Sequence, residues 1–282
     1  MKKTNYQKIT SVLIVITLGL LSMVSMAACE REAWDCPECG NKGNTDNYCG
    51  WCGHPAPWRG TSVSAAGLSV GDIIPFGTYP QTKEGTDQTP IEWIVLDYDE
   101  TNHKALLLSK YGLDTVVYYN KAWAEITWEQ CTLRTWLNGE FLENAFSMAE
   151  QSAILITNVD NGPDQGYKGW NTNGGNNTQD QIFLLSYAEA NRYLGVTYDD
   201  RNNMKSRAAP TAYAVAKGAW IKTGYKTENG KTAGWWWLRS PGSSPYFAAA
   251  VDWGGSLQLK SVENEHIIVR PALWINLESD LF

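Results

Sequence analysis

The chain has 282 residues, of which 43% are hydrophobic and 19% are charged; this balance predicts a globular protein with one large domain or two smaller ones. Its formal net charge is −7, and removal of residues 1–28, which contain three lysines and no acid, brings it to −10. An acidic protein of this kind is a poor partner for nucleic acid, because phosphate binding needs clustered cations. Nucleic acid is therefore excluded as the expected ligand.

Residues 1–28 have the layout of an export signal, with Lys2, Lys3 and Lys8 ahead of an apolar run that ends at Ala27. The sequence Met-Ala-Ala-Cys at 26–29 resembles the lipobox of bacterial lipoproteins. That resemblance implies a lipid on Cys29 and an anchor to the extracellular face of the cell membrane. Ordinary signal cleavage nearby, or retention of an uncleaved N-terminal anchor, are the alternatives. No second apolar stretch approaches the roughly 18–20 residues that a membrane span requires.

Four cysteines follow with the spacing C-x2-C-x9-C-x2-C: Cys36, Cys39, Cys49 and Cys52. Paired thiolates in this pattern predict a closed tetrahedral zinc site with a structural role. The pattern also resembles the small zinc ribbons of many bacterial proteins. Two disulfides are the rival interpretation, favoured by an oxidising compartment. Cys131 remains alone and is expected to be buried in a helical segment.

The expected organisation is a signal peptide at 1–28, a zinc ribbon at 29–57, a linker at 58–66 and one main domain at 67–282. The segment from Pro55 to Ala66, which includes this linker, is rich in proline and small residues. In the main domain, the segments at 70–81, 90–99 and 104–114 have the pattern of buried antiparallel strands.

Three short helices are expected after these strands. Thr127, Ser147 and Ser186 each stand three residues before Gln or Glu, which is the pattern of a capping box, and Gly195 is placed to end the third helix. Short capped helices between short strands predict an α+β fold. No glycine-rich phosphate loop follows a strand, which argues against nucleotide binding.

A polar tract rich in Asn, Asp and Gly spans residues 158–180. Its oxygen atoms could ligate calcium, although the spacing does not match an EF-hand. The alternative is a long surface loop made of turn-forming residues.

The last third of the chain contains two aromatic-rich segments, GWWWLRSPG at 234–242 and VRPALW at 269–274. Between them, Gly254-Gly255 predicts a two-residue hairpin turn, because such turns need positive φ angles. The predicted opposite pairs are Trp253 with Ser256, Val251 with Gln258, and Ala249 with Lys260. Alternation then places seven residues on one face, which is either a contact surface or an ordinary solvated face: Phe247, Ala249, Val251, Trp253, Ser256, Gln258 and Lys260.

The runs PIEWIVL, ALLLSKYGLD, TWEQCTLRTWLN, FSMAEQSAI, IFLLSYAE, GWWWLRSPG and VRPALWINL resemble a bacterial domain of unknown function of the kind found in Firmicutes. That domain in turn resembles the C-type lectin-like fold of formylglycine-generating enzymes and of the variable proteins of diversity-generating retroelements. The resemblance covers nearly all of 67–282. It implies a structural frame, with Trp235, Trp236, Trp237 and Leu238 in the core and Arg239 and Arg270 as residues that pin loops.

The same resemblance implies that the side chains between the two frame segments contact a ligand. The expected ligand-binding residues are Ser243, Ser244, Tyr246, Phe247, Asp252, Trp253, Ser256, Gln258 and Lys260. Tyr and Trp offer large contact areas at low entropy cost, whereas Ser and Gln offer adaptable hydrogen bonds.

These observations predict a lipoprotein on the cell surface that binds an external protein or glycan through its C-terminal hairpin, with retroelement diversification of that hairpin as a further expectation. The alternatives are a constant carbohydrate-binding or structural envelope module, and an enzyme. The oxidase activity of formylglycine-generating enzymes needs paired reactive cysteines, and the main domain has only Cys131. There is also no G-x-S-x-G or H-E-x-x-H motif, so we expect no catalytic residues.

Overall fold

The computed structural model describes residues 42–43, 67–121 and 125–282. The signal segment, Cys29, the four cysteines of the expected zinc ribbon and the linker at 58–66 lie outside the described residues. The main domain is mixed α+β and consists mostly of curled antiparallel sheets with a few short helices, as the sequence predicts.

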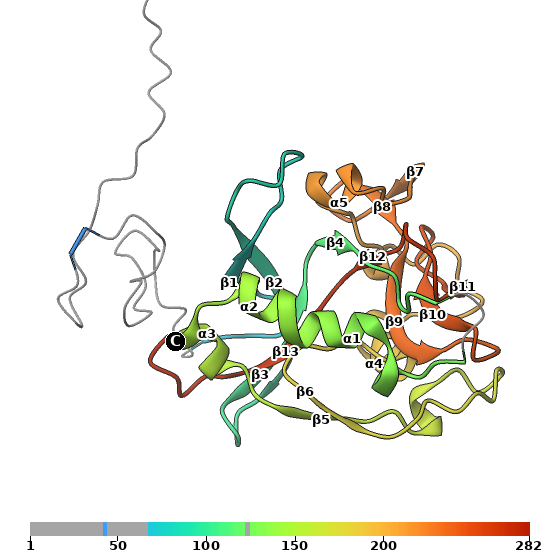
Figure 1. Ribbon diagram of the computed structural model, residues 1–282, viewed down its shortest axis with the longest axis horizontal. Helices are drawn as coiled ribbons and strands as arrows, with labels where there is room; N and C mark the ends of the chain where they lie inside the picture. The colour runs from blue at the N-terminus through green and yellow to red at the C-terminus, as the bar shows by residue number, and fades with distance from the viewer. Residues whose placement is uncertain (1–41, 44–66, 122–124) are drawn as a thin grey trace, which may run out of the picture.

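Two sheets organise the domain, and Figure 1 shows the first on the left and the second on the right. The first is antiparallel, in the order β1-β2-β3-β13, and its strands are β1 (Ile73–Tyr79), β2 (Thr89–Asp99), β3 (Lys104–Ser109) and β13 (Ala272–Asn276). The second has the order β11-β10-β9-β12-β4, with β9 and β12 parallel. Its strands are β4 (Asp114–Thr115), β9 (Trp236–Pro241), β10 (Phe247–Val251), β11 (Leu257–Ser261) and β12 (Ile268–Val269).

The chain passes between the two sheets at two places that lie side by side. Residues 110–113 lead from β3 to β4, and Arg270 and Pro271 lead from β12 to β13. Backbone hydrogen bonds join the two crossings, from Ser109 N to Pro271 O (2.9 Å) and from Leu113 N to Val269 O (3.0 Å). Arg270 is thereby held at the junction of the sheets.

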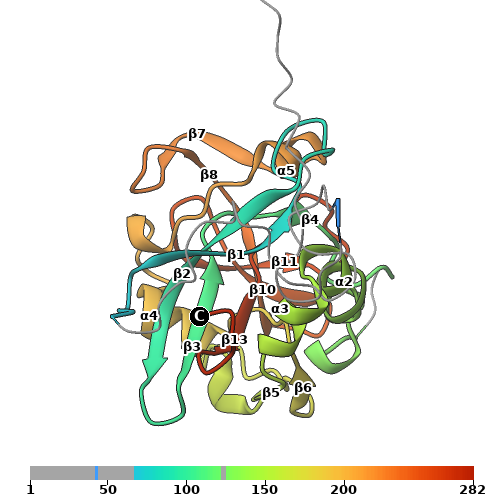
Figure 2. The same ribbon diagram turned by 90° about the vertical axis from the view of Figure 1, so that its left-hand side faces the viewer.

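Short helices and two ribbons cover the sheets. The α-helices are α1 (Thr132–Trp136), α2 (Leu142–Ala145), α3 (Met148–Ala153), α4 (Tyr187–Leu194) and α5 (Ala212–Ala216). A π-helical segment, η2 (Leu137–Phe141), joins α1 to α2, and η1 (Trp128–Gln130), η3 (Pro163–Gln165) and η4 (Met204–Ser206) are short 3-10 helices. The ribbons are β5 (Thr157–Val159) with β6 (Thr178–Asp180), and β7 (Ile221–Lys226) with β8 (Thr232–Gly234). Figure 2 shows β7 and β8 at one end of the molecule and β5 and β6 at the other.

Two of the three predicted capping boxes are confirmed. Ser147 and Ser186 each accept a hydrogen bond from the N3 amide of their helix, and the side chains of Glu150 and Glu189 each accept one from the N-cap amide. Gly195 ends α4 in the left-handed conformation (φ 70°). The prediction at Thr127 is wrong: its side chain makes no cap bond, and the extended backbone of Cys131 interrupts the helix, so that Cys131 caps α1.

The frame tryptophans are part of the core, as the resemblance implies. Trp236, Trp237 and Leu238 are fully buried and Trp235 nearly so. Buried indoles need acceptors, and Trp236 Nε1 donates to Ser206 O (3.0 Å) while Trp237 Nε1 donates to Val116 O (3.2 Å).

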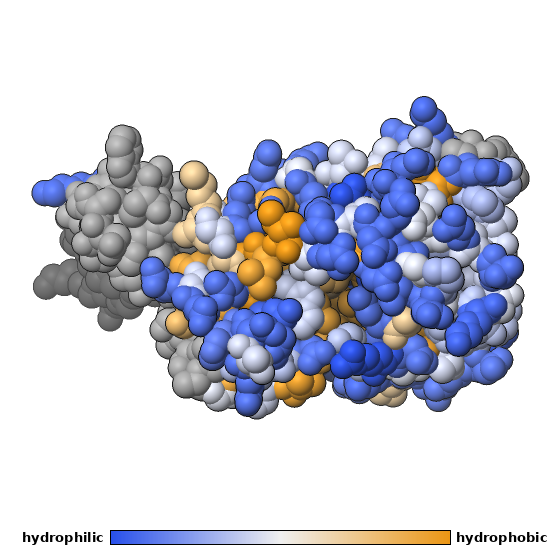
Figure 3. All heavy atoms as spheres, turned by 90° about the horizontal axis from the view of Figure 1, so that it is seen from below, coloured by the Kyte–Doolittle hydropathy of each residue, from blue (hydrophilic) through white to orange (hydrophobic). Residues whose placement is uncertain are grey.

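Hydrophilic side chains cover most of the face seen in Figure 3, and hydrophobic residues show mainly near its middle. Among the described residues, no helix combines the length and the apolar character needed to cross a lipid bilayer.

Candidate ligand-binding site

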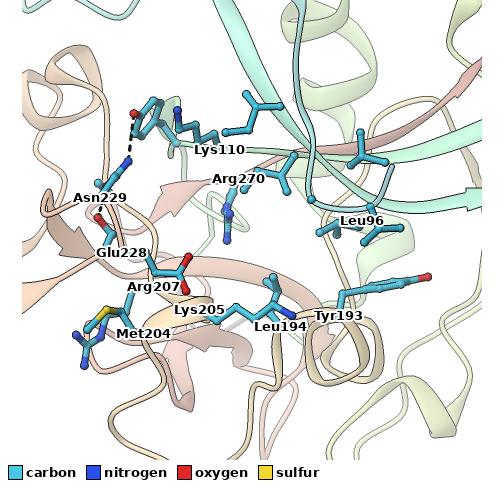
Figure 4. A pocket seen from close by; sticks show the side chains of 18 residues that line it. Leu96, Lys110, Tyr193, Leu194, Met204, Lys205, Arg207, Glu228, Asn229 and Arg270 are labelled. Carbon is cyan, nitrogen blue, oxygen red and sulfur yellow. Dashed lines mark hydrogen bonds between the residues drawn. The ribbon is translucent and has the colours of Figure 1, made fainter. Parts of the chain in front are cut away.

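A pocket of about 460 Å³ lies beside the first sheet, at the crossing that contains Arg270 (Figure 4). Its walls come from the segment before β1, from β2, from the end of α4, from η4 and from the turn between β7 and β8. The volume falls within the range of small-molecule sites in proteins, roughly 300–1,000 Å³.

Arg270 is the unusual group in this pocket, because its guanidinium is buried with a donor nitrogen that no described residue accepts from. Only 2% of the residue is exposed. Its Nε donates to Ser109 O at 2.8 Å, whereas Nη1 has no acceptor among the described residues. The guanidinium also lies 5.1 Å from the ring centre of Trp236. Burial lowers the pKa of Arg270 to about 9, so the side chain is still a cation at neutral pH.

Two of the other three cations around the pocket have protein partners, and the third, Lys205, is exposed to solvent. Arg207 donates from Nη1 to Lys226 O (2.8 Å) and from Nη2 to Asn202 Oδ1 (2.6 Å). Lys110 Nζ pairs with Glu92 Oε2 at 3.0 Å. Burial alone would lower the pKa of Lys110, but its bond to Glu92 raises that pKa above the ordinary value. Arg207 and Lys110 are thus held in place by protein oxygens, whereas Arg270 keeps a donor without an acceptor among the described residues.

Charge and hydrophobicity are unevenly distributed around the cavity. Four cations line it, at positions 110, 205, 207 and 270, against one acid, Glu228, although the whole chain is acidic. The segment before β1, strand β2 and the end of α4 supply an apolar wall that includes Ile94, Leu96 and Leu194. Figure 4 shows Arg270 between Leu96 on one side and Glu228 on the other.

Sequence reasoning missed this pocket. The family resemblance implies that Arg270 pins a loop, and its bond to Ser109 does so. The unpaired Nη1 follows from no sequence pattern. The one local signal is a lone cation inside the apolar run from Ile267 to Ile275. The remaining wall residues lie as much as 200 positions away along the chain, at Val70 and Gly71.

The predicted hairpin exists, but the predicted register differs from the observed one by one residue. Val251 pairs with Leu257 and Ala249 with Leu259, not with Gln258 and Lys260. A five-residue loop replaces the expected two-residue turn, because Asp252 Oδ1 accepts hydrogen bonds from Gly254 N (2.8 Å) and Ser256 N (3.0 Å).

A slip of one residue turns β11 over relative to β10. Gln258 and Lys260 therefore lie opposite Ala250 and Ala248, and the seven residues predicted to share one face do not. Ser256 is fully buried, and Ser243 is the one exposed member of the predicted ligand-binding set. The half-buried members are Ser244, Tyr246, Phe247, Asp252, Trp253, Gln258 and Lys260.

The structure brings two of the predicted residues together around Trp235. The rings of Trp253 and Trp235 meet edge to face at 5.3 Å, and Lys260 Nζ lies 4.2 Å from the centre of the Trp235 ring. The segment Gly242–Tyr246 has other neighbours: Gly242 O accepts from Thr172 Oγ1 (2.5 Å) and Pro245 O accepts from Ile126 N.

The hairpin tip packs against the wall of the pocket. Gly255 O accepts a hydrogen bond from Ser206 Oγ (2.7 Å), and Gly254 O accepts one from Arg207 Nε (3.4 Å). Ser206 ends η4, whose Met204 and Lys205 line the pocket. The hairpin tip thus contacts the η4 wall through Ser206 and Arg207 and stabilises its position.

Within residues 67–121 and 125–282, no group of three or more His, Cys, Asp or Glu side chains is placed to hold a metal ion. In the tract at 158–180, protein groups engage two of the three acids: Asp180 pairs with Arg134 (2.6 Å), and Asp160 accepts from Gly162 N (2.9 Å). The calcium prediction gains no support from these contacts. The zinc prediction concerns residues outside the described part.

Cys131 is fully buried, as expected, and burial raises the pKa of its thiol to about 12. The reactive thiolate is therefore scarce at neutral pH. Its Sγ accepts a hydrogen bond from Arg134 N, which is a structural role at the start of α1.

Comparison with known proteins places the chain in a family. A family model described as a domain of unknown function, DUF6273, matches residues 102–277, which is more than half of the chain. The match begins in the turn before β3, ends after β13 and includes Arg270. No curated protein and no solved structure matches the chain. The protein belongs to the DUF6273 family.

Proposed function

We propose that this protein is a ligand-binding lipoprotein of the cell envelope and that its main domain captures an external small molecule in the pocket beside Arg270. The observation that carries the proposal is a buried guanidinium that faces a cavity with an unused hydrogen-bond donor. A buried charge without a partner destabilises a fold, so its presence in a pocket is better explained by a ligand than by packing.

The proposed tether is a lipid on Cys29, followed by a zinc ribbon held by Cys36, Cys39, Cys49 and Cys52. Metal analysis of the purified protein tests the ribbon. We expect bound zinc and, after its removal by a chelator, four reactive thiols. Two disulfides would instead give neither zinc nor those thiols. A C-type lectin-like fold for the main domain remains part of the proposal, supported by its antiparallel sheets and short helices.

The pocket is tested by nuclear magnetic resonance of methionine methyl groups. A chain that begins at Cys29 contains two methionines, Met148 and Met204. Met204 lines the pocket and Met148 lies on α3, outside the pocket, with 82% exposure. A library of small neutral, anionic and cationic compounds is screened. We expect some compounds to shift the Met204 signal and leave Met148 unchanged.

If no compound shifts the Met204 signal, the pocket is not a ligand site. Equal shifts of both signals would indicate nonspecific association and would count against the proposal in the same way.

The C-terminal hairpin is the second candidate site, with protein or glycan as its ligand. The supporting observation is that the indole N–H groups of Trp235 and Trp253 have no acceptor among the described residues. Trp253→Ala should then abolish ligand capture without a change in melting temperature. A variant that unfolds would instead identify Trp253 as a core residue.

Diversification by a retroelement belongs to this second candidate. Deep sequencing of the gene's 3′ end tests it: codons 243–260 should vary at adenine-derived positions, while 234–242 and 269–274 stay constant. Equal constancy of all these codons would contradict diversification.

A further inference from the structure

Recognition in the pocket begins from the geometry of Arg270. Its Nε already donates to Ser109 O, so the Nη edge of the planar guanidinium is the part left for a ligand. The two oxygens of a carboxylate match such an edge, and charge-assisted bonds of this kind are stronger than neutral ones. An anion that presents two oxygens to this edge, as a carboxylate does, therefore completes Arg270.

The contacts of the other cations indicate which part of the pocket lining is free to bind a ligand. Lys110 is paired with Glu92, and Arg207 donates to three protein oxygens. Arg270 is thus the one buried cation of the lining that keeps a donor nitrogen without an acceptor among the described residues. One carboxylate satisfies this donor, and the buried side chains of the lining offer no second donor of this kind within the described part of the chain.

The apolar wall describes the rest of the ligand. Leu96 and Leu194 are buried, and Val70 and Ile73 are 65% and 48% exposed although they line the cavity. Apolar side chains that are exposed to solvent in a pocket favour a ligand with an apolar body, because binding removes their apolar surface from water.

We infer that the pocket binds a small monocarboxylate with an apolar body, with its carboxylate on Arg270 and its apolar part against β2 and the end of α4. This inference rests on the proposed function of the pocket. It adds the chemical class of the ligand. A fatty-acid carboxylate and the carboxylate of an acylated apolar amino acid share this chemistry.

Two matched pairs of probes test the class, with Met204 as the reporter. The pairs are octanoate with 1-octanol, and N-acetyl-L-leucine with N-acetyl-L-leucinamide. Each pair keeps an apolar body of nearly the same size and replaces the carboxylate by a neutral polar group. At pH 7, we expect at least one carboxylate to bind ten times or more tightly than its neutral partner. The pair with the larger ratio distinguishes the fatty-acid type from the amino-acid type.

Two substitutions connect the preference to the pocket. Arg270→Gln removes the cation and should bring the carboxylate and its neutral partner to similar affinity. Because Arg270 is buried, its variant needs a check of melting temperature. Ile73→Glu places an acid on an exposed wall position and should weaken the carboxylate at least fivefold.

Ile221→Glu is the matched control for Ile73→Glu. Both isoleucines lie in strands and are similarly exposed, at 48% and 46%, but Ile221 does not line the pocket. Carboxylate affinity should be unchanged in this variant. Equal loss in both variants would show a general charge effect and would overturn the inference.

The outcomes separate the ligand class from the pocket itself. Equal binding of acid and neutral probes at Met204 overturns the carboxylate inference and leaves the pocket as a ligand site. Binding of none of the four probes also overturns it. In that case, the library screen decides independently whether the pocket binds anything else.

Discussion

Gly255 shows how one residue determines the position of the hairpin tip. Its φ angle is +88°, and a Cβ added there would lie 2.0 Å from Asn203 O and 2.4 Å from Ser206 Oγ. The tip can therefore approach the segment 203–206 only because this position has no side chain. That close approach, together with the bonds of Asp252, produces the observed register.

Gly255→Ala should destabilise the domain strongly, because the added carbon meets backbone that cannot move freely. Gly230→Ala is the control: φ is +78°, but the surrounding space is empty. The conformational penalty alone is about 1–2 kcal/mol. We expect this penalty for Gly230→Ala and at least about 2 kcal/mol more for Gly255→Ala, measured by denaturant unfolding. Equal losses would show that the tip does not pack as described.

At the scale of elements, helix α3 is joined to strand β1 through one carboxylate. Glu150 Oε2 accepts from Ser147 N (2.9 Å) at the start of α3, and Oε1 accepts from Gly77 N (3.0 Å) in β1. Burial raises the pKa of Glu150 to about 7, although these hydrogen bonds act in the opposite direction. The junction therefore responds to pH.

The sign of this response follows from proton binding. Between the ordinary value of 4.5 and about 7, the folded state holds the proton more tightly than the unfolded chain does. The contribution of Glu150 to stability is therefore greatest below pH 4.5 and declines as the pH rises to 7, by at most about 3 kcal/mol.

Glu150→Gln should flatten this part of the stability curve, measured by denaturant unfolding from pH 4.5 to 8. Glu143→Gln, at an exposed position on α2, serves as the control and should keep the wild-type slope. A Glu150→Gln variant that retains the full slope would contradict the assignment.

At the scale of the whole molecule, the proposed lipid anchor determines where the pocket operates. We expect the protein in the membrane fraction, released by detergent but not by high salt, and an N-terminal peptide that begins at Cys29 with the mass of an attached lipid. Cys29→Ser should prevent lipidation. Mass spectrometry of the N-terminus distinguishes the alternatives, since ordinary cleavage gives a free N-terminus and an uncleaved anchor retains residues 1–28.

The family assignment and the α+β class are accessible from sequence because they depend on signals within short segments. The capping boxes at Ser147 and Ser186 involve residues three positions apart, and the strands near 73–79, 89–99 and 104–109 follow from local apolar patterns. The burial of Trp236 and Trp237 is what the family resemblance of the segment 234–242 implies. Each of these features requires no knowledge of a distant residue.

Tertiary structure alone decided the hairpin register and the pocket. The register depends on contacts between Gly255 and residues 203–206, about fifty positions earlier. The pocket depends on the meeting of segments near 70, 94, 194, 228 and 270. Arg270 is unusual because its neighbours in space leave Nη1 without an acceptor among the described residues. The packing of the two sheets determines those neighbours, and no local sequence pattern contains that packing.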